Sequence, residues 1–96
     1  MEDHMQEFIW ETPADINMGI AKRIKNIRKR RKITQKQLAA RCNVSYGSLK
    51  KFEQTGEISL ISLTKIAMEL GLDSELRSLF TQPVYLNIEE VINDVR

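Results

Sequence analysis

Residue types that carry chemistry in enzymes and metal sites are scarce in this chain. Its 96 residues include one cysteine and one histidine. Cys42 cannot form an internal disulfide, and His4 has no second ligand at the spacing of a metal site. With one histidine and one cysteine, no Ser/His/Asp set, paired carboxylates in a cleft, phosphate-binding loop or metal-ligand cluster can be assembled. The sequence therefore predicts no enzyme active site, no metal and no cofactor.

Long apolar stretches are also missing. No apolar run approaches the ~18 residues that a membrane-spanning helix needs. The first residues are acidic where a secretion signal would be basic. We therefore expect a cytoplasmic protein without membrane contact. The hydrophobic fraction of 42% is ample for one small helical core, and the chain has room for one domain.

The segment QKQLAARCNVSYGSLKKFEQ, residues 35–54, has small and apolar side chains at the spacing of a helix-turn-helix. Ala39 is small at the point where the first helix is crossed closely by the second. Asn43 stands at the turn and tolerates the left-handed backbone conformation required there. The buried sides of both helices are formed by Leu38, Val44, Leu49 and Phe52. Cys42 is expected to be a small core residue of the first helix.

Capping residues indicate where the helices of this motif begin. Thr34 and Gln37 form a T-x-x-Q capping box for the first helix. Ser45 caps a second helix that we expect over residues 46–55. The exposed positions of this second helix are Tyr46, Gly47, Ser48, Lys50, Lys51 and Gln54. None of them is acidic, which favours contact with a negatively charged partner.

A long helix before the motif and two helices after it complete the expected domain. Thr12 caps the long helix, with Pro13 at its first position. Gly19 lowers the helix propensity by about 1 kcal/mol, so we expect the segment before it to fray or form a separate turn. Ser59 caps a fourth helix, and Asp73 begins a short fifth. The apolar residues expected to line these helices or close the core are Ile16, Ile20, Ile24, Ile27, Leu60, Leu63, Ile66, Ala67, Leu70, Leu76, Leu79 and Phe80.

The net charge of +2 conceals an uneven distribution of charge along the chain. Residues 1–15 carry −5, residues 16–72 carry +10, and residues 73–96 carry −3. A strongly basic middle segment is typical of a module that contacts phosphates. The basic run RKRRK, residues 28–32, is one candidate for such contacts. Alternatively, it is a solvated helix end whose cations interact favourably with the helix dipole.

The core pattern, caps and basic positions together resemble the helix-turn-helix domains of phage repressors and Cro proteins, also called the xenobiotic-response-element family. The resemblance covers residues 20–72, including IRKRRKITQKQLAARCNVSYGSLKKFEQTGEISLISLTKIAMELGL. It implies an all-α, five-helix, lambda-repressor-like domain that binds a pseudo-palindrome as a dimer, with its third helix in the major groove. We expect this domain over residues 13–80, with flexible extensions at residues 1–12 and 81–96.

The resemblance also assigns roles to individual residues. Gln35 corresponds to the residue that binds a phosphate and supports the recognition helix. Arg28 and Glu53 correspond to a partly buried structural ion pair. Gly47 stands where repressors often have a long polar side chain, so we expect fewer direct base contacts or a close backbone approach to DNA. The predicted DNA-binding residues are Gln35, Lys36, Ser45, Tyr46, Gly47, Ser48, Lys50, Lys51, Arg30 and Arg31; of these, Tyr46, Gly47, Ser48 and Lys50 correspond to base-facing positions.

The two ends of the chain have patterns of their own. In the acidic segment 1–12, Phe8, Ile9 and Trp10 form an apolar cluster that is compatible with a flexible terminus, a partner contact or an arm folding back on the basic face. The tail 81–96 has apolar residues at helical spacing, Ile88, Val91, Ile92 and Val95, preceded by a candidate edge strand of Val84, Tyr85 and Leu86. Such a helix is too short to be stable alone. We expect it to contact its own domain, a dimer mate or another protein, or to remain disordered.

Three functions are compatible with these features. The first is a sequence-specific transcription regulator, a homodimeric repressor that occupies its operator on double-stranded DNA. The second is the antitoxin of a type II toxin–antitoxin pair, which autoregulates its operon and binds a HipA-like kinase toxin; SLKKFEQTGEISLISLTKIAMELGL resembles such antitoxins. The third is a coactivator or bridging module, which the cationic recognition face disfavours.

Overall fold

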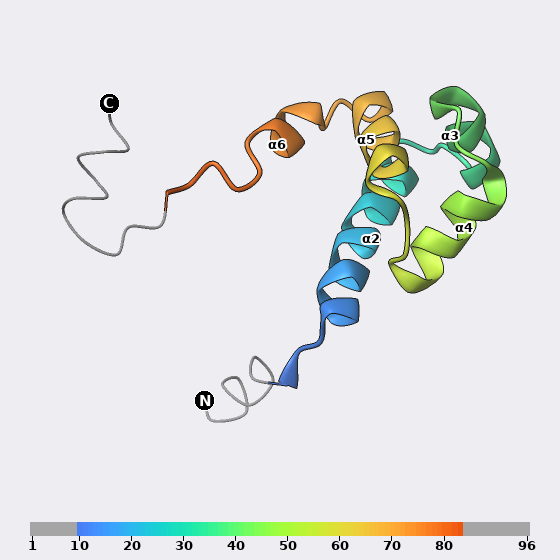
Figure 1. Cartoon of the computed structure of the whole chain (residues 1–96). Coiled ribbons are helices and arrows are strands. Elements are labelled where there is room, and N and C mark those ends of the chain that lie inside the picture. Colours follow the sequence, from blue (N-terminus) through green and yellow to red (C-terminus); the bar gives the residue numbers. More distant parts are fainter. Residues whose placement is uncertain (1–9, 84–96) are drawn as a thin grey trace.

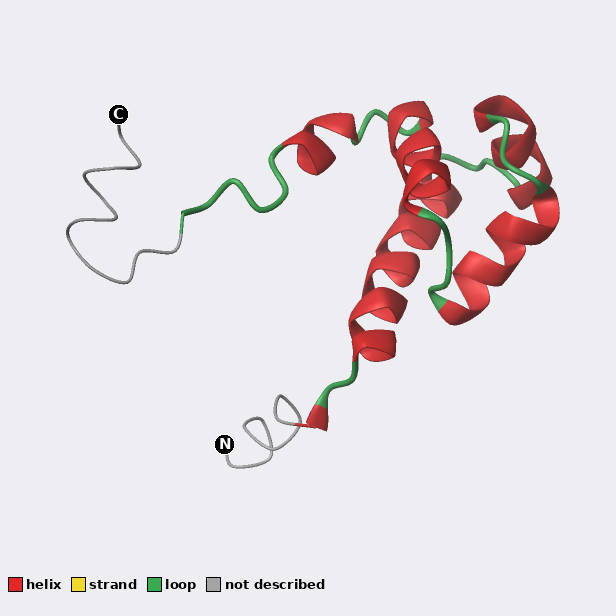
Figure 2. Ribbon diagram, viewed as in Figure 1, coloured by secondary structure: helices red, strands yellow, loops and turns green. Residues whose placement is uncertain are grey.

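The computed structural model describes residues 10–83, which fold into helices joined by short turns (Figures 1 and 2). In chain order the helices are α2 (Pro13–Arg30), α3 (Gln35–Cys42), α4 (Tyr46–Thr55), α5 (Leu60–Glu69) and α6 (Asp73–Arg77). No strand occurs within residues 10–83, and no helix in that part is long and apolar enough to cross a membrane. The predicted all-α, five-helix class is confirmed.

The helices begin and end where the capping residues predict. The hydroxyl oxygens of Thr12, Thr34, Ser45 and Ser59 each accept the backbone N–H three residues further along the chain. At the two threonines the third helical residue reciprocates, so both capping boxes are complete. Asn43 ends α3 in the left-handed conformation, with φ 57° and ψ 45°. The predicted turn of the helix-turn-helix is thereby confirmed.

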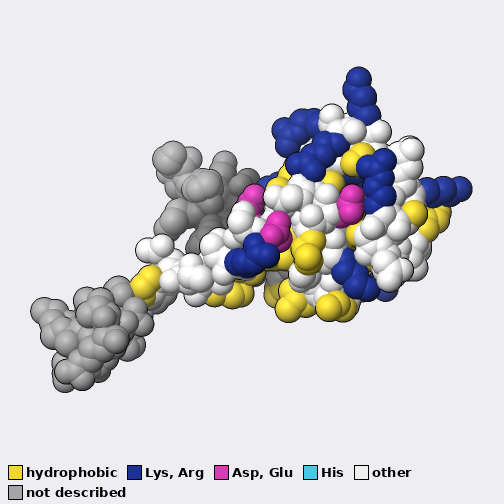
Figure 3. All heavy atoms as spheres, turned by 90° about the horizontal axis from the view of Figure 1, so that it is seen from above, with side chains coloured by type: hydrophobic (Ala, Val, Ile, Leu, Met, Phe, Trp, Pro, Cys, Tyr) yellow, Lys and Arg dark blue, Asp and Glu magenta, His cyan; other side chains and the backbone are white. Residues whose placement is uncertain are grey.

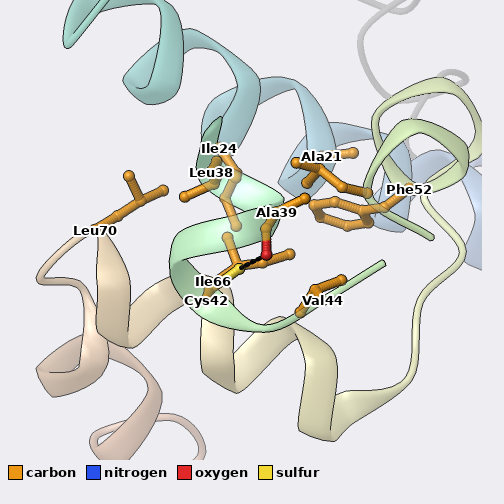
Figure 4. Packing of buried hydrophobic residues seen from close by; sticks show 10 residues of the cluster. Ala21, Ile24, Leu38, Ala39, Cys42, Val44, Phe52, Ile66 and Leu70 are labelled. Carbon is orange, nitrogen blue, oxygen red and sulfur yellow. Dashed lines mark hydrogen bonds between the residues drawn. The ribbon is translucent and has the colours of Figure 1, made fainter. Parts of the chain in front are cut away.

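The core lies where α2, α3, α4 and α5 meet (Figure 4). α2 packs against α4, and α3 packs against both α4 and α5. Ala39 is 3% exposed, and its small side chain permits this close contact of helices. Burial raises the pKa of the Cys42 thiol above its ordinary value, and Cys42 is confirmed as a core residue. The buried apolar cluster consists of Ala21, Ile24, Leu38, Ala39, Cys42, Val44, Leu49, Phe52, Ile66 and Leu70.

Three predictions about the ends of helices are wrong. Phe80 and Leu79 are 93% and 51% exposed, because both follow Arg77, the last residue of the short helix α6, and lie outside the buried cluster. Leu60 is 72% exposed, because as the first residue of α5 it lies at the rim of an open hollow beside α2. Ile16 is likewise half-exposed in the first turns of α2. The core is therefore closed by α2 to α5, and α6 packs mainly against α5.

The predicted fraying of α2 before Gly19 is also wrong. α2 is continuous from Pro13 through Gly19 to Arg30. Its capping box and the proline at its first position stabilise the first turn, and this offsets the low helix propensity of one glycine. α2 is thus the longest helix of the described part of the chain, and it packs mainly against α4 (Figure 1).

The turn after α4 requires glycine at position 56. Gly56 has φ +82°, and a Cβ atom there would lie 2.8 Å from the carbonyl carbon of Asn17 and 2.9 Å from the backbone N of Met18. Real Cβ atoms do not approach backbone atoms this closely. The missing side chain lets the end of α4 lie directly against the backbone of α2.

We expect Gly56→Ala to lower the free energy of unfolding by about 3 kcal/mol, because it combines a strained backbone with a clash against α2. Gly71→Ala is the matched control. Gly71 also has positive φ, +72°, but a Cβ there would meet no atom within 4 Å, so a cost of about 1 kcal/mol is expected. Urea unfolding measures both variants, and equal losses would show that the contact with α2 is unimportant.

Candidate nucleic-acid interface

One side of α4 faces the core and the other faces solvent. Leu49, Phe52 and Glu53 are buried, and Phe52 is 1% exposed. The residues predicted to be exposed on the other side, Tyr46, Gly47, Ser48, Lys50, Lys51 and Gln54, are all exposed. α4 therefore presents a continuous polar and cationic surface, as the second helix of a helix-turn-helix does.

A cluster of three side chains joins α3 and α4 on this surface. The Nζ atom of Lys36 lies 5.5 Å from the centre of the Tyr46 ring, and that of Lys50 lies 5.8 Å from it. Both distances are within the range of cation–π attraction, which is worth about 0.5–1 kcal/mol at exposed sites. We call these three residues the Lys–Tyr–Lys cluster. It places two cations within 6 Å of the centre of one aromatic ring at the solvent-facing start of α4.

The serines at the start of α4 fix its first turn. Ser45 Oγ accepts the backbone N–H of Ser48 at 3.0 Å and donates its own proton to Ser48 Oγ at 2.7 Å. The Ser48 hydroxyl is thus held in place but remains exposed. A hydroxyl in this position can donate to or accept from a base edge or a phosphate.

Lys51 has an acidic neighbour that sequence reasoning missed. Its Nζ atom lies 3.3 Å from Oε1 of Glu57, with both side chains mostly exposed. Glu57 lies just beyond the end of α4, and the left-handed turn at Gly56 brings its side chain back to the helix. Inspection of the residues within α4 therefore could not reveal this pair. Such an exposed pair adds little stability. Lys51 and Glu57 line an open hollow of about 440 Å³ together with Ser59 and Ser62 at the start of α5.

Beneath the exposed face, a buried ion pair ties α2 to α4. Arg28 Nε donates to Oε2 of Glu53 at 2.7 Å, and Arg28 Nη2 donates to Oε1 at 2.9 Å. Gln35, the first residue of α3, donates from Nε2 to the same Oε1 at 2.8 Å. Arg28 Nη1 donates to the carbonyl oxygen of Ile33 at 2.8 Å. We call Arg28, Gln35 and Glu53 the buried polar network, because it joins three helices and the loop between two of them.

Both charges of this network are removed from water. The side chains of Arg28 and Glu53 are 8% and 1% exposed. Burial acts to raise the pKa of Glu53, but hydrogen bonds from Arg28 and Gln35 and the charge of Arg28 outweigh it, so the pKa lies below its ordinary value. Among the described residues, no buried side-chain nitrogen or oxygen lacks a hydrogen-bond partner. Removing one member of a buried pair leaves the other charge uncompensated, which typically costs about 3–5 kcal/mol.

The remaining predicted residues lie at the end of α2. Arg30 is its last residue and Arg31 its cap, and both are exposed. They precede the turn into α3, so the chain places them near the start of the motif but in a separate group from the Lys–Tyr–Lys cluster. Figure 3 shows Lys and Arg side chains projecting from much of the visible surface, with few Asp or Glu side chains among them. Within residues 10–83, no group of three or more potential metal ligands occurs.

A family model described as helix-turn-helix matches residues 24–76, which contain all of α3 and α4. This chain belongs to the helix-turn-helix family. The resemblance to the xenobiotic-response-element type is thereby confirmed, and the protein is a DNA-binding transcription regulator. A comparison with curated proteins gives no match.

The buried polar network predicts how stability depends on pH. Because the pKa of Glu53 is lowered in the folded state, its contribution is complete above the ordinary carboxyl pKa of about 4.3 and is lost as pH falls through the lower folded-state value. Glu53→Gln should be less stable at neutral pH and should lose less stability on acidification than the parent protein. Urea unfolding at a series of pH values measures both.

Asp73→Asn is the control for this experiment. Asp73 also has a lowered pKa, because it accepts a hydrogen bond from Arg77, but the pair is on the surface of α6. This variant should keep nearly all of the parent protein's pH dependence. If Glu53→Gln also keeps the pH dependence of the parent protein's stability, Glu53 is not the group that stabilises the packing of α2 against α4.

Proposed function

We propose that this transcription regulator is a repressor that binds a pseudo-palindromic operator as a homodimer and blocks access to the promoter by occupancy. The observation that carries the proposal is the exposed face of α4. It displays the Lys–Tyr–Lys cluster, exposed serines and no exposed acidic side chain of its own. A helix inserted into the major groove needs such a face, because base edges are read by donors and acceptors between two rows of phosphates.

In this proposal the residues near the start of α4 contact the bases. Lys50 donates to guanine N7 and O6, Ser48 bonds a base edge, and the Tyr46 ring lies against a thymine methyl group. Gly47 supports close approach, because even an added Cβ atom there would meet nothing within 4 Å inside the protein. The backbone of α4 is therefore accessible at that position, and part of the sequence preference comes from DNA shape.

A second set of residues contacts the phosphates. The start of α3 directs unpaired backbone N–H groups and the positive end of the helix dipole outward, which favours an anion. Gln35 lies at this point and, through its bond to Glu53, is positioned both to contact a phosphate and to support α4. Lys36, Ser45 and Lys51 flank the same face, and Arg30 and Arg31 extend the cationic surface along the end of α2. These contacts position the domain but carry no sequence information.

A second candidate function uses the same DNA face. In the antitoxin alternative, favoured by the resemblance of residues 48–72 to antitoxins of HipA-like kinase toxins, the protein also binds a toxin. The predicted partner-binding tail, residues 81–96, lies mostly outside the described residues. A toxin gene adjacent to this one, and retention of its product on the tagged full-length protein, would distinguish the antitoxin from a repressor that acts alone.

Lys50→Ala is expected to weaken binding to the preferred DNA sequence by about 1–3 kcal/mol and to affect random DNA much less, because it removes a donor to a base edge. Arg30→Ala is the matched control. It also removes one exposed cation, but it should weaken binding evenly on both sequences and reduce the salt dependence. Titrations at several salt concentrations measure both effects. Equal losses on both DNAs for Lys50→Ala would contradict its role in base reading.

A further inference from the structure

An apolar groove lies on the part of the domain built by α2, α5 and α6. Its volume is about 270 Å³, and its apolar lining includes Ile20, Ile24, Ile27, Leu63, Leu76 and Leu79. The isoleucines come from α2, and Leu76 and Leu79 come from α6 and the turn that follows it. None of these residues belongs to the exposed face of α4. The DNA-binding proposal therefore leaves this groove without a function.

The chain beyond the described residues matches the groove in length and pattern. Ile20 and Ile27 are seven positions apart, about 10 Å along a helix at 1.5 Å per residue. In residues 84–96, Ile88 and Val95 are also seven positions apart, and Val91 and Ile92 lie between them at helical spacing. A helix over this segment would present one apolar stripe as long as the row of isoleucines on α2.

The starting point of this segment favours the groove of its own chain. Leu79 lines the groove, and only residues 80–83 separate it from the segment. A tether this short gives the segment an effective concentration on the order of millimolar near the groove. A helix that is too short to be stable alone is stabilised when it docks, because docking buries its apolar stripe.

Charge favours the same arrangement. Residues 84–96 carry three acidic residues and one arginine, whereas α2 carries six basic residues and one acidic residue. Arg23 lines the groove on the α2 side, and Glu75 lines it on the α6 side. Glu90 and Asp94 share one flank of the apolar stripe, so docking with that flank toward α2 brings opposite charges together.

We propose that residues 84–96 fold as an amphipathic helix into the groove between α2, α5 and α6 of their own chain, and so complete the core on the side away from the exposed face of α4. The apolar stripe Ile88, Val91, Ile92 and Val95 covers the isoleucines of α2 and the exposed part of Leu79. The tail is then a structural part of the domain, and its docking leaves the α4 face free for DNA.

Two variants of the full-length protein test this proposal. Ile92→Asp places a charge in the apolar stripe, and Asn93→Asp adds the same charge on the opposite side of the same helix. Amide hydrogen exchange in residues 88–95 should be slowed about tenfold or more relative to an unstructured peptide in the parent protein. This protection should persist in Asn93→Asp and be lost in Ile92→Asp. The methyl NMR signals of Ile24, Leu63 and Leu76 should shift in Ile92→Asp only.

The methyl signals of Leu38 and Val44, which lie in the buried core, report whether each variant remains folded. Unprotected amides in residues 88–95 of the parent protein would overturn the proposal. So would groove signals that respond equally to the two variants. Protection that disappears on dilution would also overturn it, because the occupant would then be the tail of a second copy.

Discussion

The bond between Glu53 and Arg28 is the constraint on which the functional geometry depends. A carboxylate and a guanidinium, each removed from water, are joined by two hydrogen bonds, and Gln35 adds a third to the same carboxylate. The three residues come from α4, α2 and α3. The buried polar network therefore fixes how the two helices of the motif, α3 and α4, are oriented relative to α2. Apolar packing alone tolerates small sliding movements, whereas these directional bonds do not. The exposed face of α4 is therefore held in place from the opposite, buried side of the helix.

Much of the fold could be predicted from sequence because its determinants are local. Thr34, Ser45 and Asn43 act within a few residues, and the caps and the turn form where these residue types predict. Predictions at helix ends were wrong where burial depends on distant partners. Phe80 has the apolar character of a core residue but is 93% exposed. The residues around Phe80 in the sequence do not reveal that α6 ends at Arg77. The turn before Gly19 stays helical because the complete capping box at Thr12 stabilises it more than one glycine destabilises it.

The candidate site was predictable in composition but not in arrangement. Its residues follow from the position of α4 in the motif and from its lack of exposed acidic side chains. That Lys36 of α3 and Lys50 of α4 would both lie near the Tyr46 ring could not be predicted, because it depends on the crossing of α3 and α4. The pairing of Lys51 with Glu57 depends in the same way on the turn at Gly56. In both cases the contact depends on the path that the chain takes between two exposed residues, and the sequence pattern does not specify this path.

The most direct test of the central claim is selection of bound sequences from random duplex DNA by the full-length protein at near-physiological salt. If α4 reads base edges from a dimer, a palindrome should be enriched whose half-sites are about 10 base pairs, or a multiple of one helical turn, apart from centre to centre. Retention of DNA at low salt without any enriched sequence would contradict the account, because the cationic face would then bind phosphates without reading bases.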